Sequence, residues 1–413
     1  MSGIKRFFGK FLILAVMLLG LPLLGVWLAG FPVSDYLEFP PTTRYVRHEP
    51  FSWLVFILYS GIICTCLTPL IITALKQPRK VEPESRPARS FPWWGWLGLI
   101  IGMMAWMMAW TRFKWFAVFQ PHTFTPLWLA FIVVINALCH RQRGNCMMLD
   151  RPAFFLLLFP ISAAFWWFFE YLNRFVQNWY YIGPQFNAWE YFWYATLPFS
   201  TVLPAVLGLR DWLISARWLR LRFDHLKPLR APSPKILAAL TLALSAGGLA
   251  AIGIWPNILF PLLWVAPLLI ILSLQTLMDE RHILSGPFAG NWTAVVAAAM
   301  AAVICGVFWE MWNFFSLAKW QYCIPFVQRY HIFEMPLLGY AGYLPFGLQC
   351  AVVGSLLEET ARGKDIHTKT PERIISDFVS GTDFADIPGE AVVAAQDAFL
   401  DCIGVAMAGS SEP

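Results

Sequence analysis

The feature of this 413-residue sequence that most constrains its fold is a series of long apolar runs without a charged residue. Residues 11–29 and 236–255 are two of these runs, and each approaches the roughly 20 residues with which an α-helix crosses a bilayer. Only 13% of all residues are charged, against about 25% in a typical soluble domain, and 58% are hydrophobic. This composition excludes an ordinary soluble enzyme for most of the length, and it excludes intrinsic disorder. The sequence therefore predicts an all-α, polytopic membrane protein.

The apolar runs can be divided into individual membrane spans. We predict about ten transmembrane helices, at residues 11–30, 51–75, 93–111, 123–139, 153–175, 190–209, 236–254, 257–278, 291–317 and 336–357. The first span is longer than the roughly 7–15 apolar residues of a signal peptide, which favours a retained signal anchor over a cleaved signal.

The distribution of basic residues predicts the orientation of these spans. With the N-terminus in the cytoplasm, all but seven of the 30 Lys and Arg residues fall on the cytoplasmic side. This bias agrees with the positive-inside rule. We therefore expect an integral protein of the inner (cytoplasmic) membrane, of the bacterial type, with both termini in the cytoplasm.

Two segments in the middle of the chain resemble each other. Residues 168–175 (FFEYLNRF) correspond to residues 308–315 (FWEMWNFF), and both contain Glu-x-x-Asn. An aromatic cluster, a second Glu and a Pro-Phe pair then follow in the same order in each copy. We interpret the pattern as two parallel four-helix repeats, with the chance similarity of aromatic-rich helices as the alternative.

The repeats predict the organisation of the whole chain. The expected parts are two N-terminal transmembrane helices with a basic loop (1–92), membrane repeat 1 (93–213), a basic cytoplasmic connector (214–235), membrane repeat 2 (236–358) and a short, soluble, helical tail (359–413).

Six polar residues recur near one end of the predicted bundle. Glu170 and Glu310 lie about 25 Å along helices that run outward, and each has an Asn three residues further on, on the same helix face. Because ionisable groups inside a span are costly, they indicate a ligand, proton or ion site by default. The candidate ligand-binding residues are Glu170, Asn173, Glu190, Glu310, Asn313 and Glu334.

The same residues admit a chemical and a structural interpretation. Aromatic faces beside carboxylates suit a cationic ligand, and Glu310 is the preferred acid or cation stabiliser because no basic residue lies four positions later. In the structural alternative, Glu170 forms an ion pair with Arg174, and the Glu and Asn side chains only join neighbouring helices. Catalytic residues stay unassigned.

Motifs for other chemistries are absent from the sequence. Cys64 and Cys66 are too close for the usual zinc pair, and the eight cysteines show no disulfide or metal pattern. There is no phosphate loop, nucleophile elbow, zinc-protease motif or dinucleotide fingerprint. We therefore predict no metal, no cofactor and no nucleic-acid partner, and we expect membrane lipid and a lipophilic small molecule as partners.

The polar tail resembles part of a known family. Residues 375–381 (ISDFVSG), 387–388 (IP) and 399–409 (FLDCIGVAMAG) are similar to the opening of MmgE/PrpD proteins, within a resemblance that covers about 371–413. That family contains 2-methylcitrate dehydratase-like and aconitate decarboxylase-like enzymes, which are soluble and several hundred residues longer. The resemblance supplies no catalytic residue, because the family's active site lies beyond this segment. The tail is then either a remnant of fusion, frameshift or truncation, or a docking segment for a protein partner.

Three classes of function follow. The leading hypothesis is a membrane protein that binds or processes a lipid or isoprenoid ligand at the outer side of the membrane. The alternatives are a secondary transporter or non-catalytic membrane subunit, and a nominal MmgE/PrpD lyase without its catalytic part. The sequence leaves open whether the protein is an enzyme.

Overall fold

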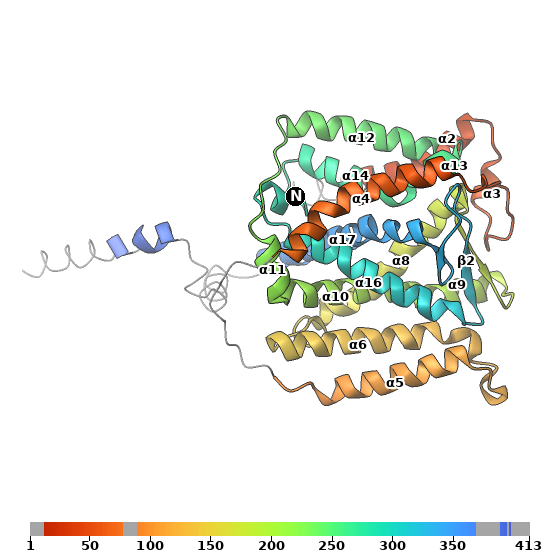
Figure 1. Cartoon of the computed structure of the whole chain (residues 1–413), viewed down its shortest axis with the longest axis horizontal. Helices are drawn as coiled ribbons and strands as arrows, with labels where there is room; N and C mark the ends of the chain where they lie inside the picture. The colour runs from red at the N-terminus through yellow and green to blue at the C-terminus, as the bar shows by residue number, and fades with distance from the viewer. Residues whose placement is uncertain (1–11, 77–88, 369–388, 395, 398–413) are drawn as a thin grey trace, which may run out of the picture. The chain divides into compact units, whose positions relative to one another are not determined.

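The computed structural model describes residues 12–76, 89–368, 389–394 and 396–397. This part of the chain is mostly helical (Figure 1), and eight of its helices are long and apolar enough to cross a membrane. The eight segments are Trp53–Leu75, Trp93–Trp110, Gln120–Arg143, Pro152–Val176, Ala188–Ser215, Pro234–Ala251, Thr293–Phe314 and Leu337–Glu358. Two shorter apolar helices occupy Leu12–Leu28 and Leu262–Leu277. The prediction of a mostly helical chain with several helices suited to span a membrane is confirmed.

The elements of the first part of the chain alternate long helices with short turns. They are η1 (Val16–Gly20), α2 (Leu21–Leu28), α3 (Val33–Tyr36), α4 (Trp53–Leu75), α5 (Trp93–Trp110), η2 (Lys114–Phe116), η3 (Gln120–His122), α6 (Phe124–Arg143), α7 (Met147–Asp150) and α8 (Pro152–Val176). Strand β1 (Trp179–Ile182) follows α8, then α9 (Ala188–Phe199), α10 (Val202–Ser215) and α11 (Arg217–Phe223).

The remaining elements begin with α12 (Pro234–Ala251), α13 (Pro256–Leu259), α14 (Leu262–Leu277), α15 (Ser285–Phe288) and α16 (Thr293–Phe314). Three short strands come next, β2 (Lys319–Tyr322), β3 (His331–Ile332) and β4 (Met335–Pro336). The last elements are η4 (Leu337–Gly342) and α17 (Tyr343–Thr368).

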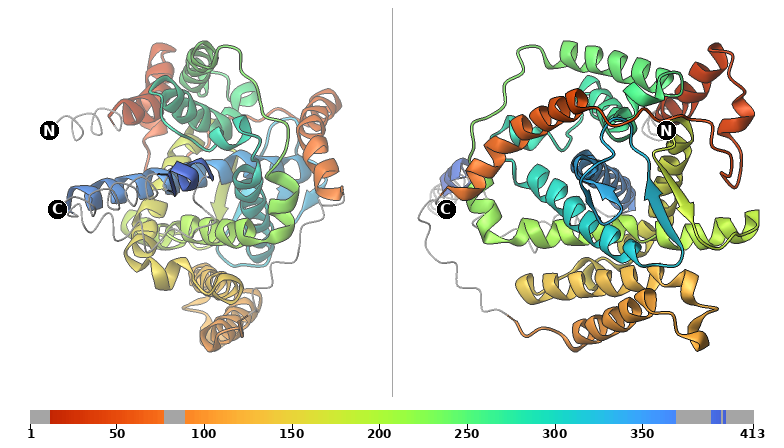
Figure 2. Two further views of the ribbon diagram at one scale, coloured as in Figure 1. Left: turned by 90° about the vertical axis from the view of Figure 1, so that its left-hand side faces the viewer. Right: turned by 45° about the vertical axis from the view of Figure 1, so that its right-hand side comes forward.

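The helices pack in pairs and around a central helix. Helix α5 lies along α6, and α12 lies along both α14 and α2; Figure 1 shows these groups at opposite edges of the bundle. Helix α10 contacts α6, α8 and α16, and α17 runs through the middle of the helices in the second view of Figure 2. Helix α4 differs from these helices because none of its residues is buried.

Small residues allow the closest helix contacts. A Cβ at Gly347 of α17 would overlap the backbone carbonyl of Ala298 of α16, and a Cβ at Gly25 of α2 would overlap that of Ala250 of α12. Contacts of this kind are typical of membrane helices, where van der Waals packing replaces the hydrophobic effect between helices. Next to the first contact, the fully buried Phe346 packs against an aromatic cluster that includes Trp166, Trp264 and Trp309.

The predicted span at 190–209 is two helices. Helix α9 contains Pro198 and ends at Phe199, and α10 begins at Val202. The Ser162 hydroxyl of α8 donates to the Phe199 carbonyl at 2.6 Å and accepts from the Leu203 amide at 3.0 Å. A side chain of the neighbouring helix therefore supplies hydrogen bonds at the break, as a buried helix end requires.

The strands are the second difference from the sequence-based fold. Strand β1 pairs with β2, and β3 pairs with β4, each in an antiparallel two-stranded sheet. The fold is mostly helical, as predicted, and these two short sheets are elements that the sequence-based prediction did not include. Glu334, just before the span predicted at 336–357, lies in the turn between β3 and β4.

The chain divides into two compact units, Met1–Gly354 and Ser355–Pro413. In the second unit, residues 389–394 and 396–397 are helical. Most of the segment that resembles MmgE/PrpD proteins lies outside the described residues.

Candidate functional site

A two-stranded ribbon joins the two parts of the chain that carry the Glu-x-x-Asn sequences. Trp179 of β1 pairs with Tyr322 of β2, and Tyr181 pairs with Trp320. Because side chains alternate along a strand, these four aromatic residues share one face of the ribbon. Tyr180 and Gln321 occupy the opposite face, where the Tyr180 hydroxyl donates to the Gln321 side chain at 3.1 Å.

The two Asn residues attach this ribbon to the helices. The Asn173 side chain accepts from the Asn178 amide at 2.8 Å and donates to the Trp179 carbonyl at 2.8 Å. Asn313 accepts from the Trp320 amide at 2.9 Å and donates to the Trp320 carbonyl at 2.8 Å. Both Asn residues are buried, so they satisfy backbone groups that would otherwise lack partners.

Glu170 receives a cluster of donors from the aromatic face of the ribbon and from its own helix. Its Oε1 accepts from the Tyr181 hydroxyl at 2.6 Å and from the indole nitrogens of Trp166 and Trp179 at 3.0 Å each. Glu170 is 7% exposed. No described residue hydrogen-bonds its other oxygen, Oε2, so that atom is available to a molecule in the adjoining cavity.

Glu310 has a similar but more enclosed setting. Its Oε1 accepts from the hydroxyls of Tyr322 and Tyr343, at 2.7 and 2.8 Å. Burial and the neighbouring Glu310 carboxylate raise the pKa of Tyr322 well above its usual range, so the hydroxyl stays protonated and donates. Glu310 is fully buried, and its Oε2 has no hydrogen-bond partner among the described residues.

A cavity of about 1110 Å³ lies against this ribbon. Its walls include Trp166 and Glu170 of α8, Tyr181 of β1, Tyr322 of β2 and Trp264 of α14. Helix α4 contributes a row of mainly apolar residues, namely Tyr59, Ile62, Ile63, Cys66 and Leu67. The cavity is therefore largely aromatic and aliphatic, with a few polar groups near the ribbon, as is usual for small-molecule sites.

The structure separates the six candidate residues into three groups. Glu170 and Asn173 line the cavity. Glu310 and Asn313 lie behind its wall, because Tyr322 and Tyr343 stand between Glu310 and the cavity. Glu190 and Glu334 have structural partners instead.

These partners are local. Glu190 completes a capping box at the start of α9, accepting from the Asn187 amide at 3.1 Å while the Asn187 side chain accepts from the Glu190 amide. Glu334 forms an ion pair with Lys319 of β2 at 2.5 Å. Among the residues described here, these two carboxylates are not part of the cavity wall.

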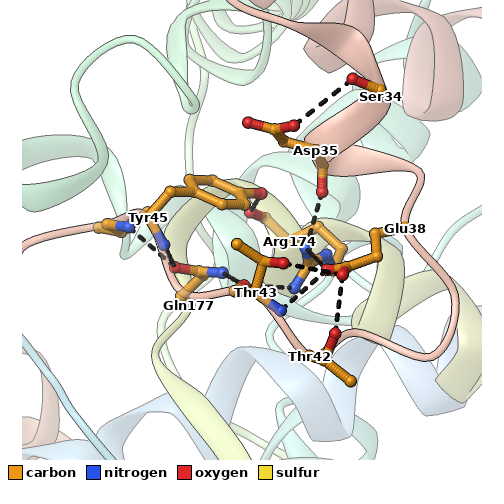
Figure 3. A network of polar contacts seen from close by, with 9 residues as sticks. Ser34, Asp35, Glu38, Thr42, Thr43, Tyr45, Arg174 and Gln177 are labelled. Atoms are coloured by element: carbon orange, nitrogen blue, oxygen red, sulfur yellow. Dashed lines mark hydrogen bonds and ion pairs between the residues drawn. The ribbon is translucent and has the colours of Figure 1, made fainter.

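A loop from α3 to α4 is tied to the end of α8 by a polar network (Figure 3). The Arg174 guanidinium donates to Glu38 Oε2 at 3.2 Å and to the Asp35 carbonyl at 2.7 Å. The Gln177 side chain accepts from the amide of Tyr45 at 2.9 Å and donates to the Thr43 carbonyl at 2.9 Å. The ion pair of Arg174 is thus with Glu38, in place of the Glu170–Arg174 pair that the sequence suggested.

Glu38 gives this network a defined pH dependence. The Thr43 amide, the Thr42 hydroxyl and Arg174 lower the pKa of Glu38 from its ordinary value of 4.5 to about 2. A carboxylate with a lowered pKa stabilises the folded state above pH 4.5, and this contribution is lost as the pH falls from 4.5 through 2. We expect Glu38→Gln to lower the melting temperature at pH 7 and to have little effect near pH 2.

Thermal unfolding of the purified protein, followed by tryptophan fluorescence across this pH range, measures the difference. Asp35→Asn is the matched control, because the Asp35 carboxylate contacts only the Ser34 hydroxyl in the described network. An unfolding difference for Glu38→Gln that is independent of pH, or one that Asp35→Asn reproduces, would contradict the assignment.

Two parts of the site were not identified from the sequence. Arg44 lines the cavity from a loop and His122 from η3, and the segment from Pro40 to Arg44 forms part of the cavity wall. Loop residues carry no periodicity, so the sequence offered no signal for Arg44. The aromatic clusters at 179–181 and 320–322 were noticed, but their pairing as strands was not.

Other kinds of site receive no support from the described residues. No group of three or more His, Cys, Asp and Glu residues in the described ranges is placed to hold a metal ion.

Comparisons with protein-family models, with curated proteins and with solved structures found no match to this chain.

Proposed function

We propose that this protein binds a lipophilic ligand in the cavity beside the β1–β2 ribbon. One observation carries the proposal. The cavity of about 1110 Å³ has a nearly buried carboxylate, Glu170, in a largely aromatic and aliphatic wall. Burying a carboxylate is costly, and three donors to Oε1 stabilise it while Oε2 stays unpaired within the described chain. A ligand group that donates to Oε2 completes the set.

The ligand-contacting role belongs to Glu170 in this proposal. Glu310 was the preferred residue from sequence, but Tyr322 and Tyr343 intervene between it and the cavity. Glu310 then orients two tyrosines of the wall, and Glu170 meets the ligand directly.

A lateral entry from the membrane fits the position of α4. Its cavity-facing residues include Ile62, Ile63 and Leu67, and the helix has no buried residue. A lipid chain could pass beside such a helix without leaving an apolar environment. This supports a lipid or isoprenoid ligand over a small polar solute.

The proposal includes a ten-helix topology with two four-helix repeats. Two equivalent features support the repeats. Helix α5 lies on α6 as α12 lies on α14. Asn173 and Asn313 each use their side-chain oxygen and nitrogen to bond the backbone at or next to the strand that follows. The excess of basic residues on the predicted cytoplasmic side supports an orientation in which the ribbon and the cavity lie on the outer side of the inner membrane.

Two native cysteines test occupancy of the cavity. Cys66 lines the cavity, and Cys64 lies on the same helix, is also exposed, and is not part of the cavity wall. We expect a total lipid extract of the source membrane, added to delipidated protein in detergent, to slow maleimide modification of Cys66 several-fold and to leave Cys64 unchanged. Peptide mass spectrometry measures both rates in one sample.

The Glu170→Gln variant tests whether the Glu170 carboxylate contributes to ligand binding. It retains an acceptor for the aromatic donors, so we expect it to fold and to show weaker protection of Cys66. Equal slowing at Cys64 and Cys66, or no slowing at either, would contradict ligand binding in the cavity.

A further inference from the structure

Among the described residues, three Arg and Lys side chains line the cavity, and Arg44 is the one of these without an acidic partner. The other two, Arg174 and Lys319, form ion pairs with Glu38 and Glu334. Arg44 makes no hydrogen bond or ion pair with any described residue. Its guanidinium lies over the Tyr180 ring, with the carbon atom 3.4 Å from the ring centroid.

The backbone on both sides of Arg44 is fixed. The Thr43 carbonyl and the Tyr45 amide both bond the side chain of Gln177, at 2.9 Å each. The Arg44 side chain is therefore presented from a tethered loop, and Tyr180 holds its planar group through a cation–π contact. This pre-orders the guanidinium and reduces the entropy that binding would otherwise cost.

A second polar group without a partner belongs to the wall of the same cavity. Asn178 lines the cavity and is 3% exposed, and its Oδ1 is buried without a hydrogen-bond partner in the described structure. It follows Gln177 directly in the chain, and its carbonyl accepts from the Cys323 amide at 2.7 Å. A buried carboxamide oxygen without a partner is costly, and a donor from a molecule in the cavity would remove this cost.

We propose that Arg44 and Asn178 form a subsite for the anionic headgroup of a lipid whose chains occupy the cavity. The inference rests on the proposed function and adds the charge of the ligand. A guanidinium with all its N–H donors free matches a phosphate or carboxylate group in a two-point contact. The unpaired Asn178 Oδ1 is an acceptor, so it accepts from a hydroxyl donor of the same headgroup and not from the anion itself.

Binding of two lipids with identical acyl chains tests the proposal. Delipidated protein in detergent is titrated with phosphatidylglycerol and with uncharged diacylglycerol, and native mass spectrometry measures the bound fractions. We expect the wild type to bind phosphatidylglycerol about tenfold more tightly, since a charge-assisted pair contributes roughly that factor. Arg44→Gln should abolish this preference, and Arg44→Lys should retain part of it.

Arg47→Gln is the matched control, because Arg47 belongs to the same loop and is exposed but does not line the cavity. It should bind both lipids as the wild type does. Thermal unfolding of each variant establishes that it is folded.

The remaining outcomes overturn one claim or the other. Equal binding of both lipids by the wild type, or an unchanged preference in Arg44→Gln, overturns the headgroup subsite and leaves the proposed function in place. Failure of both lipids to bind overturns the proposed function itself. If inorganic phosphate competes for the site and the protein shows no preference between the two lipids, the occupant is a free anion. That result overturns the lipid assignment.

Discussion

Gly347→Ala is expected to destabilise the packed membrane helices strongly, by about 3 kcal/mol or more. The new Cβ would overlap the backbone carbonyl of Ala298, and backbone cannot move aside as a flexible side chain can. The helices α16 and α17 would have to separate beneath the aromatic cluster around Phe346. Overpacking in a well-packed core usually costs about 1–3 kcal/mol, and a backbone overlap belongs at the upper end or beyond.

The loss in free energy of unfolding can be measured in mixed micelles with increasing sodium dodecyl sulfate, with unfolding followed by tryptophan fluorescence. The controls are Gly61→Ala on α4 and Gly247→Ala on α12, where an added Cβ meets no atom within 4 Å. These substitutions should be neutral or slightly stabilising, because Ala favours the helix over Gly. A Gly347→Ala protein as stable as these controls would contradict the close contact.

Glu310→Leu is expected to destabilise the folded protein by about 2–6 kcal/mol. The substitution leaves the hydroxyls of Tyr322 and Tyr343 without their acceptor, and each orphaned buried donor costs about 1–3 kcal/mol. Glu310→Gln should cost much less, because the carboxamide oxygen still accepts from both hydroxyls. The same unfolding measurement in mixed micelles compares the variants.

A double-mutant cycle with Tyr343→Phe isolates the contact. Among the described hydrogen bonds, the Tyr343 hydroxyl bonds only Glu310. In the double variant Glu310→Leu with Tyr343→Phe, the Tyr343 hydroxyl is therefore absent and is not left without an acceptor. We expect the double variant to be more stable than the sum of the single effects by about 0.5–3 kcal/mol. Strict additivity would show that the two groups do not interact in the folded state.

The helical part of the fold could be predicted because lipid imposes strict requirements on sequence. Runs such as 53–75 and 293–314 must be long, apolar and nearly free of charge, and these properties are visible without any tertiary information. The break between α9 and α10 could not be predicted in the same way. It depends on Ser162 of α8, which is a contact between residues about 40 positions apart.

The candidate site was predictable in part for a similar reason. Glu170 and Glu310 are conspicuous as acids inside apolar helices, and the structure gives each of them tyrosine donors. Their different access to the cavity could not be read from Glu-x-x-Asn sequences that are the same in both copies. The difference comes from Tyr343, which reaches Glu310 from a helix 33 residues further along the chain.

Arg44 shows the limit of the sequence-based approach most clearly. Nothing in residues 40–50 indicates that this loop forms part of a cavity wall. Its position depends on Gln177, which ends α8 in the left-handed region at φ 49° and places its side chain on the loop backbone. A long-range contact of this kind becomes apparent only in three dimensions.

The pairing of β1 with β2 has a consequence for biogenesis. Strand β1 is synthesised long before β2, and the donors that Glu170 requires, Trp166, Trp179 and Tyr181, all belong to the earlier segment. The first carboxylate can therefore acquire its partners during translation, while the ribbon closes only after α16 has been inserted. The cavity wall also includes residues of η4 and α17, so the complete cavity can exist only after the later half of the chain has docked onto the earlier half.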